Sequence, residues 1–298
     1  MIVAASKGSL AVAIFFGSRS SGVATNSASA YDLMLVCDRP WLFYAAMRDK
    51  GLLGRSPALL SALDPWLPPT QIRLVQGAWL AKASVLSTTA LRRATSTGRK
   101  DQFVAGRLFQ DVQVVWTRDV TASEEMAAAI ESARRVTLDW VSPDLPDRFD
   151  AAGYVRQLFR TSFRFEVRPE SRGRADALHE AQAARLVPVF ESLLRKLAAQ
   201  GRLVAHGDGT FSVDPPVSRA RARATRLFLE WSRVRATARW PKHAVTFDGW
   251  LDYIVRKAER HSGEAIVLTP MESRFPLLLL WPKVFRFLRR QRRKGRPV

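Results

Sequence analysis

Three residues near the N-terminus have the types and spacing that phosphate chemistry needs: Gly17, Ser18 and Asp32. An apolar run ends at Phe16, the Gly-Ser pair follows, and Asp32 stands near the start of the next apolar run. A glycine turn lets backbone N–H groups approach a phosphate closely, a serine adds a hydroxyl, and a carboxylate can hold Mg²⁺. This combination is typical of nucleotidyltransferases, which bring a nucleoside triphosphate against a nucleophile.

The same residues have a plain structural alternative, because Gly-Ser and Asp-Leu pairs also occur in ordinary strand-turn-strand units. The commoner nucleotidyltransferase pattern has two acids spaced Asp-x-Asp on the second strand, and here the earlier position is Ala30. A site for two metal ions would therefore lack one ligand, unless another carboxylate or the substrate's own phosphate replaces it. Asp101, Asp111 and Asp119 are candidates for a further ligand, and their spacing does not choose among them.

The elements that must position these residues alternate between strand and helix patterns over residues 1–122. Apolar and alternating stretches predict strands at 10–16, 30–36, 72–79 and 111–116, and periodic stretches predict helices at 41–50, 56–63, 85–93 and 101–108. We therefore expect an α+β fold, in which a nucleotidyltransferase domain with a mixed sheet occupies residues 1–122.

A helical domain is predicted for residues 123–216 and a basic helical region for residues 217–298. Helices are expected at 124–141, 153–165 and 175–200, followed by a β-hairpin at 202–213, because Gly207-Asp208-Gly209 suits a tight turn between alternating strands. Helices followed by a hairpin indicate a winged-helix-like domain. Beyond it, helices are predicted at 219–239 and 247–261.

The composition narrows the class of protein. The 298 residues include 47 Lys and Arg against 27 Asp and Glu, a net charge of +20, and residues 218–298 alone contribute +14. A partner with a dense negative surface is therefore expected there. A single cysteine, Cys37, excludes an internal disulfide, and four scattered histidines give no zinc pattern. The single cysteine favours a reducing, cytoplasmic setting. The longest apolar stretch is too short for a helix that spans a bilayer.

The C-terminal tail has the pattern of a helix that lies on a membrane surface. Apolar residues recur at helical spacing, and basic residues occupy the remaining positions from Lys283 to Lys294 without an acid among them. The predicted membrane-binding residues are Trp281, Phe285, Arg286, Arg289 and Arg290. An anionic membrane is favoured over nucleic acid, because apolar residues and a tryptophan suit the interface of a bilayer. Packing within the protein is the other alternative.

Several segments in the same order resemble one known family. They are Gly17-Ser18, Tyr31-Asp32-Leu33-Met34, Lys82-Ala83-Ser84-Val85 and Val104-Ala105-Gly106-Arg107-Leu108. Together they resemble the mitochondrial translocator assembly and maintenance protein family and its bacterial relatives, which are peripheral phosphatidate cytidylyltransferases. The resemblance implies a polymerase-beta-like nucleotidyltransferase domain and Mg²⁺ as the cofactor. It also implies CTP and phosphatidic acid as substrates, and CDP-diacylglycerol as the product of a step in phospholipid biosynthesis at the inner face of the cell membrane.

On this hypothesis, Asp32 binds Mg²⁺, Lys82 neutralises a phosphate, Arg107 clamps one, and Gly17 and Ser18 cradle the nucleotide. The sequence departs from the family where Ala83-Ser84 follows the lysine, and the base preference has no visible determinant. Structural alternatives are a solvated Lys82 and an Arg107 paired with an acid such as Asp111. Two other functions stay open: transfer of a nucleotide to another phosphorylated or hydroxylated acceptor, and nucleic-acid binding without catalysis.

Overall fold

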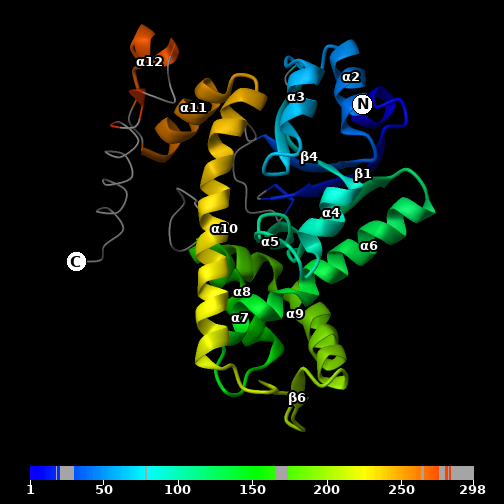
Figure 1. Ribbon diagram of the computed structural model, residues 1–298, viewed down its shortest axis with the longest axis vertical. Helices are drawn as coiled ribbons and strands as arrows, with labels where there is room; N and C mark the ends of the chain where they lie inside the picture. The colour runs from blue at the N-terminus through cyan, green and yellow to red at the C-terminus, as the bar shows by residue number, and fades with distance from the viewer. Residues whose placement is uncertain are drawn as a thin grey trace.

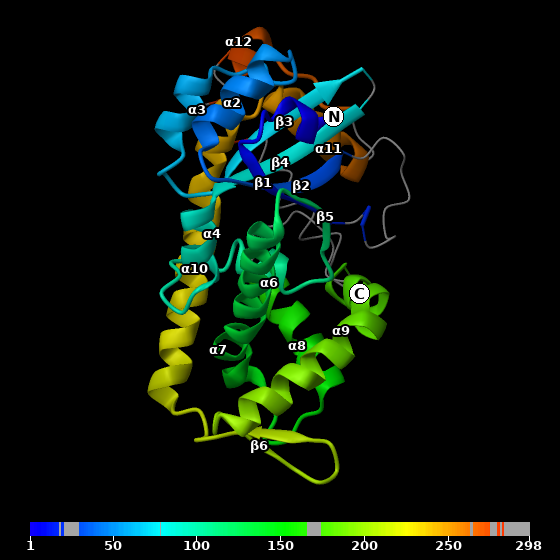
Figure 2. The same cartoon turned by 90° about the vertical axis from the view of Figure 1, so that its right-hand side faces the viewer.

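The protein is elongated, with a sheet near one end, a group of helices near the other and one long helix beside both (Figures 1 and 2). A computed structural model describes residues 1–17, 19–20, 30–77, 79–165, 174–262, 265–274, 279–280 and 282. The described strands are β1 (Leu10–Phe16), β2 (Tyr31–Cys37), β3 (Thr70–Gln76), β4 (Trp79–Ser87), β5 (Gln113–Thr117), β6 (Leu203–Ala205) and β7 (Phe211–Val213). The described helices are α1 (Ile2–Ala5), α2 (Pro40–Asp49), α3 (Pro57–Leu63), α4 (Thr88–Thr95), α5 (Ala105–Leu108), α6 (Val120–Arg135), α7 (Thr137–Val141), α8 (Ala151–Arg164), α9 (Arg174–Ala199), α10 (Arg219–Thr246), α11 (Trp250–Ser262) and α12 (Pro270–Arg274), with a short 3₁₀ turn, η1, at Ser142–Asp144.

The larger sheet is mixed, with five strands in the order β3-β4-β2-β1-β5. β1 pairs antiparallel with β2 and β5, and β3 pairs antiparallel with β4, whereas β2 and β4 run parallel. Parallel neighbours need a crossover connection, and α2, α3 and β3 provide it. The inner strands β1 and β2 are almost continuously apolar because helices cover both of their faces. The predicted α+β class with a mixed sheet is confirmed.

Each face of the sheet has its own hydrophobic cluster. On one face α2 and α3 pack against the strands, and Phe43 meets Leu35 there. On the other face α4, α5 and α6 cover the strands, and Leu91 belongs to the same cluster as Met34. Successive side chains of a strand point to opposite faces, so Asp32 lies on the same face as Met34.

The cluster on the Met34 face continues from the sheet into α7, α8, α9 and the hairpin of β6 and β7. Phe109 links the two parts, because its ring contacts Trp140 and Phe159 edge to face, with centroids 6.4 and 5.3 Å away. The predicted β-hairpin is confirmed, and Gly209 in its turn has a φ of +81°. The predicted domain boundaries at residues 122 and 216 stay predictions.

A buried ion-pair group fastens α10 to the sheet end of the molecule. Arg239 and Arg235 lie 2.7 and 2.8 Å from the same carboxylate oxygen of Asp101. Further along the helix, three side chains donate hydrogen bonds to backbone carbonyls next to and within β3: Arg239 to Pro68 at 2.9 Å, Lys242 to Trp66 at 2.6 Å and Thr246 to Gln71 at 2.7 Å. These contacts hold α10 beside β3, although the two elements are far apart in the sequence.

The structure corrects three predicted elements before residue 110. The strand predicted at 72–79 ends as β3 at Gln76, the start of the helix predicted at 85–93 belongs instead to β4 at Trp79–Ser87, and α4 begins only at Thr88. β4 is extended because it pairs with β2 on one side and with β3 on the other, and this pairing outweighs the helix propensity of the Ala and Leu residues in β4. The helix predicted at 101–108 shortens to α5, because Asp101 instead accepts hydrogen bonds from arginines of α10.

Three predicted helices have different ends. The helix at 124–141 is divided into α6 and α7, the helix at 219–239 continues as α10 to Thr246, and the helix at 247–261 begins as α11 at Trp250. α10 continues through Pro241 while its buried side keeps its contacts with the β3 region.

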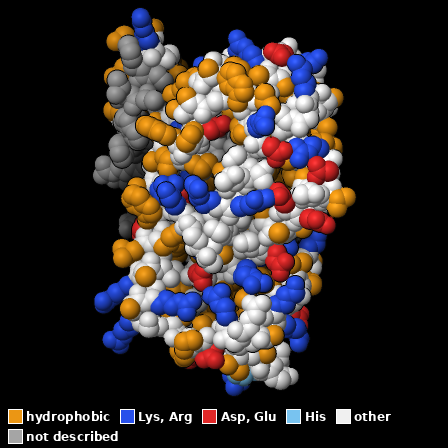
Figure 3. Space-filling model, turned by 45° about the vertical axis from the view of Figure 1, so that its right-hand side comes forward, with side chains coloured by type: hydrophobic (Ala, Val, Ile, Leu, Met, Phe, Trp, Pro, Cys, Tyr) orange, Lys and Arg blue, Asp and Glu red, His pale blue; other side chains and the backbone are white. Residues whose placement is uncertain are grey.

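The described surface carries the charge excess that the sequence predicts, and basic and hydrophobic side chains are interspersed on the face seen in Figure 3. Within the ranges that the structure describes, none of the helices is long and apolar enough to cross a membrane.

Replacing Asp101 by Asn should lower the free energy of unfolding by about 3–5 kcal/mol, because it leaves a buried guanidinium without its carboxylate. The side chain of Arg239 is only 1 % exposed, so water cannot take the place of the lost partner. Urea denaturation measures the change, and Asp208→Asn in the exposed hairpin turn is the matched control. An Asp101→Asn protein as stable as the wild type contradicts this account.

The pH dependence of stability provides a second test of the ion pair between Asp101 and the α10 arginines. Burial alone would raise the pKa of Asp101, but Arg239 and Arg235 outweigh it and hold the pKa below its ordinary value. Because the folded pKa is below the unfolded one, the ion pair stabilises fully above about pH 4, and its contribution disappears as the pH falls through the folded pKa. The stability gap between the wild type and Asp101→Asn should therefore narrow at acid pH.

Candidate active site

Asp32 and Lys82 face each other across the parallel strands at the centre of the sheet. The register of β2 and β4 places the two residues side by side, and Lys82 Nζ lies 3.2 Å from Asp32 Oδ1. Their side chains are 28 % and 27 % exposed, so a ligand can reach both. Two of the predicted site residues are thus in direct contact.

Gly17 lies against the other carboxylate oxygen of Asp32. The register of β1 and β2 pairs Phe16 with Asp32, so the turn that follows Phe16 passes beside the carboxylate. Gly17 has a φ of +86°, and a Cβ atom there would lie 2.7 Å from Asp32 Oδ2, which leaves no room for a side chain. The predicted meeting of a glycine turn and a carboxylate is present, whereas Ser18 lies outside the described residues.

Lys82 keeps its positive charge in this setting. The Asp32 carboxylate raises the pKa of Lys82 above its ordinary value, against the opposing effects of burial and of the Arg107 charge. A lysine that stays protonated cannot accept a proton at neutral pH, but it can neutralise an anion. The role predicted for Lys82 agrees with its electrostatics.

Arg107 stands close enough for its charge to act on Lys82. From α5 its guanidinium donates to the Phe103 carbonyl at 2.8 Å and lies 3.9 Å from the centre of the Phe103 ring. These contacts hold the guanidinium in one place. Asp111, the acid suggested as an alternative partner of Arg107, pairs with Arg185 at 2.6 Å.

The two C-terminal helices α10 and α11 contribute further groups to the surroundings of Lys82. Tyr253 of α11 interacts electrostatically with Lys82. The positive charges of Lys82 and Arg107 both act on the imidazole of His243 in α10. His243 Nε2 is buried and has no hydrogen-bond partner among the described residues. Burial, and then neighbouring cations with Lys242 foremost, lower the pKa of His243 to about 3, so its ring is neutral at physiological pH.

The turn between α10 and α11 is fixed against the sheet. Gly249 has a φ of +63°, and a Cβ atom there would lie 2.7 Å from Arg73 Nη1, so the turn touches that guanidinium directly. Arg73 is in turn the register partner of Lys82 in the pairing of β3 with β4. The rings of Phe247 and Tyr253 lie 5.3 Å apart across this turn. α11 is thereby held beside the strand that carries Lys82.

The local charge suits a polyanion. Among the described residues, the cations of Lys82 and Arg107 lie near the Asp32 carboxylate and Arg73 is opposite Lys82 on the next strand, and this positive charge favours an anionic ligand such as a triphosphate. Across the part of the chain that the structure describes, no group of three His, Cys, Asp or Glu residues could hold a metal ion. Mg²⁺ is commonly bound by one or two carboxylates together with substrate phosphates and water. These residues therefore fit a magnesium ion that binds with a nucleotide, and they do not form a metal centre on their own.

The three candidates for a further metal ligand are engaged elsewhere. Asp101 forms the buried pair with α10, and Asp111 pairs with Arg185. Asp119 pairs with Arg118 at 2.8 Å and caps the first turn of α6. The structure gives no support to a second ligand among them.

The predicted membrane-binding residues Trp281, Phe285, Arg286, Arg289 and Arg290 lie outside the described side chains.

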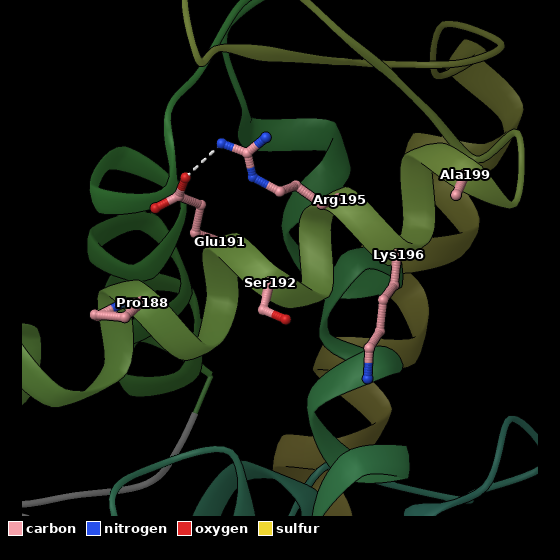
Figure 4. A pocket seen from close by; sticks show the side chains of 6 residues that line it. All are labelled: Pro188, Glu191, Ser192, Arg195, Lys196 and Ala199. Atoms are coloured by element: carbon pink, nitrogen blue, oxygen red, sulfur yellow. Dashed lines mark hydrogen bonds and ion pairs between the residues drawn. The ribbon is translucent and has the colours of Figure 1, made fainter.

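Two hollows elsewhere on the surface do not compete with this site. One of about 490 Å³ is lined by six residues of α9 alone, and Figure 4 shows Glu191 and Arg195 paired along that helix at 2.8 Å. The other, of about 530 Å³, lies on the face of the sheet opposite to Asp32 and has apolar walls that include Leu33 and Trp116. Neither brings together groups that could carry out a reaction.

No known family model and no curated protein matches this chain.

Sequence reasoning missed Arg73, His243 and Tyr253. The alternation of β3 puts Arg73 between the buried Ile72 and Leu74, and this pattern would have placed it beside Lys82 had β4 been recognised as a strand. His243 and Tyr253 carry no comparable local signal, because only the docking of α10 and α11 brings them to the sheet.

Replacing Gly17 by Ala should displace the Asp32 carboxylate and weaken by at least about tenfold the binding of CTP with Mg²⁺, the ligands that the sequence predicts for this site, which calorimetry can measure. Gly209→Ala is the matched control, because Gly209 has a similar φ of +81° but nothing within 4 Å of the added Cβ. Both substitutions should cost about 1 kcal/mol in stability through backbone strain. Equal nucleotide binding by the two variants would refute the proposed closeness of Gly17 to the ligand.

Proposed function

We propose that this protein is a magnesium-dependent phosphatidate cytidylyltransferase, which makes CDP-diacylglycerol and pyrophosphate from CTP and phosphatidic acid at a membrane surface. The observation that carries the proposal is the contact of Gly17, Asp32 and Lys82 at one accessible point of the sheet. The choice of CTP and phosphatidic acid follows from the family that the motifs resemble.

The fold supports this assignment at a coarser level. A mixed five-stranded sheet with the acid on an inner strand agrees with a polymerase-beta-like nucleotidyltransferase domain. Helices α8 and α9 followed by the β6–β7 hairpin agree with a winged-helix-like domain. The excess of positive charge in residues 218–298 agrees with a protein that binds the anionic inner face of the cell membrane.

The proposed reaction needs little proton transfer. The phosphate of phosphatidic acid is already an anion, so it can attack the α-phosphorus of CTP without a strong general base. One P–O bond forms to the lipid phosphate while the bond to pyrophosphate breaks, and the leaving group takes the electron pair. Bound Mg²⁺ would supply neutralisation of the triphosphate charge.

The chain's own residues would position and neutralise the reacting groups. Asp32 would hold Mg²⁺, and it positions Lys82 through the ion pair at 3.2 Å. Lys82, whose pKa is raised so that it stays protonated at neutral pH, and Arg107 would bind phosphate oxygens of the nucleotide or of the acceptor. Gly17, which has no side chain, lets the Asp32 carboxylate lie directly against the turn after β1.

The decisive assay incubates the protein with each of the four α-labelled nucleoside triphosphates, Mg²⁺ and vesicles that contain phosphatidic acid. The expected result is a labelled lipid with CTP together with one equivalent of pyrophosphate, and no labelled lipid when Mg²⁺ is chelated. Label transferred to a different acceptor would assign a related transferase. Absence of transfer to any lipid or water-soluble phosphate would refute the proposal.

Asp32→Asn and Lys82→Met should each lower the turnover of that reaction by about 100-fold or more, because each removes a charge that the transition state needs. Both side chains are partly exposed, so the variants should remain folded, as thermal melting can verify. Asp208→Asn, in the hairpin far along the chain, is the control and should keep full turnover. Undiminished activity of Asp32→Asn would exclude this site.

A further inference from the structure

α10 carries a line of exposed hydrophobic side chains from Leu227 to Val245. Leu227, Trp231, Val234 and Val245 are 72 %, 56 %, 54 % and 40 % exposed. They are spaced by three, four or eleven residues, so they lie on one side of the helix. Ala238 and Pro241 continue the same line and are also exposed. We call these six positions the α10 stripe.

The α10 stripe is separate from the residues through which α10 packs on the described part of the protein. The buried residues of the same helix are Leu229, Ser232, Arg239, Lys242 and Thr246, which face the sheet and the helical group. α10 thus packs on the protein mainly through polar and charged side chains, while the α10 stripe leaves an apolar side of the helix exposed. Isolated exposed hydrophobic side chains need no explanation, but a continuous line with a tryptophan at its centre indicates a contact surface.

Basic residues flank the α10 stripe. The helix contains seven arginines and one lysine against a single glutamate, Glu230. No acidic side chain among the described residues lies within ion-pair distance of Arg219, Arg223 or Arg226, and all three arginines are exposed. Their charge is not neutralised within the described part of the protein.

This combination selects one kind of partner. A second copy of the chain would bring like charges together along the helix, and that repulsion disfavours self-association through this side. Nucleic acid would use the arginines but has no need of Leu227, Val234 and Val245. An anionic bilayer uses both, because arginines bind lipid head groups, apolar side chains enter the acyl boundary, and tryptophan favours the interface.

We propose that the outward side of α10 binds anionic membranes directly, with the α10 stripe inserted at the interface and the flanking arginines on the head groups. The proposal does not depend on the chemistry of the Asp32 site. It also differs from the predicted tail contact, because it concerns residues 219–246.

A single fluorescent label can report this contact in the full-length chain. Cys37 is the one cysteine and is fully buried, so a cysteine introduced at an exposed position can be labelled selectively. Trp231→Cys places an environment-sensitive dye in the centre of the α10 stripe. Val120→Cys is the matched control, because Val120 is 72 % exposed at the start of α6, on the other side of the molecule from α10 in Figure 1.

The labelled proteins are titrated with phosphatidylcholine vesicles with and without 30 mol % phosphatidylglycerol, and binding is measured by flotation. The expected result is a blue shift at position 231 with anionic vesicles only, and no shift at position 120. Leu227→Ser with Val234→Ser should weaken vesicle binding by at least about tenfold. Turnover of a water-soluble short-chain phosphatidic acid measures the Asp32 site separately and should be unchanged in that double variant.

Three outcomes overturn the proposal. Flotation without a shift at position 231 would mean that another part of the chain binds the bilayer. A shift that depends on protein concentration without vesicles would assign the α10 stripe to self-association. A shift with duplex DNA or RNA but not with anionic vesicles would assign it to nucleic acid.

Discussion

The candidate site depends on one constraint, the register of the parallel strands β2 and β4. This register puts Lys82 beside Asp32, and the antiparallel register of β1 with β2 brings the Gly17 turn to the other side of the same carboxylate. A shift of one residue in either pairing would turn the side chains to the opposite face and separate the three groups. The apolar side chains buried on both faces of the inner strands prevent such a shift, so the hydrophobic core fixes the geometry of the polar site.

The C-terminal helices complete the surroundings of this site from a distant part of the sequence. The buried pairing of Asp101 with Arg235 and Arg239 fastens α10, and the turn after α10 then sets α11 against Arg73. A buried ion pair adds little net stability compared with apolar packing, but breaking it is costly, and such pairs can specify one arrangement. Here the pair specifies where α10 lies, and with it both the wall of the site and the outward stripe that we assign to the membrane.

The part of the site that comes from β1 and β2 could be predicted from the sequence. The turn at Gly17 and the acid at Asp32 follow from apolar runs interrupted by small and polar residues, and the structure has both where they were expected. β4 was not recognised, because its Ala, Leu and Ser residues have no strong strand preference and only pairing on both sides makes them extended. His243 could not be predicted, since its place in the site comes from tertiary contacts of a long basic helix.

The central claim is that Asp32 holds a divalent cation together with a triphosphate, and binding of Mn²⁺ in place of Mg²⁺ tests it most directly. Electron paramagnetic resonance can count free Mn²⁺ in the presence of the protein, with and without a non-hydrolysable CTP analogue. The account predicts weak Mn²⁺ binding by the protein alone, because a single carboxylate binds a divalent cation poorly. With the CTP analogue present, Mn²⁺ should bind at least about tenfold more tightly, and Asp32→Asn should abolish this increase. Ternary binding that is unchanged in Asp32→Asn would contradict it.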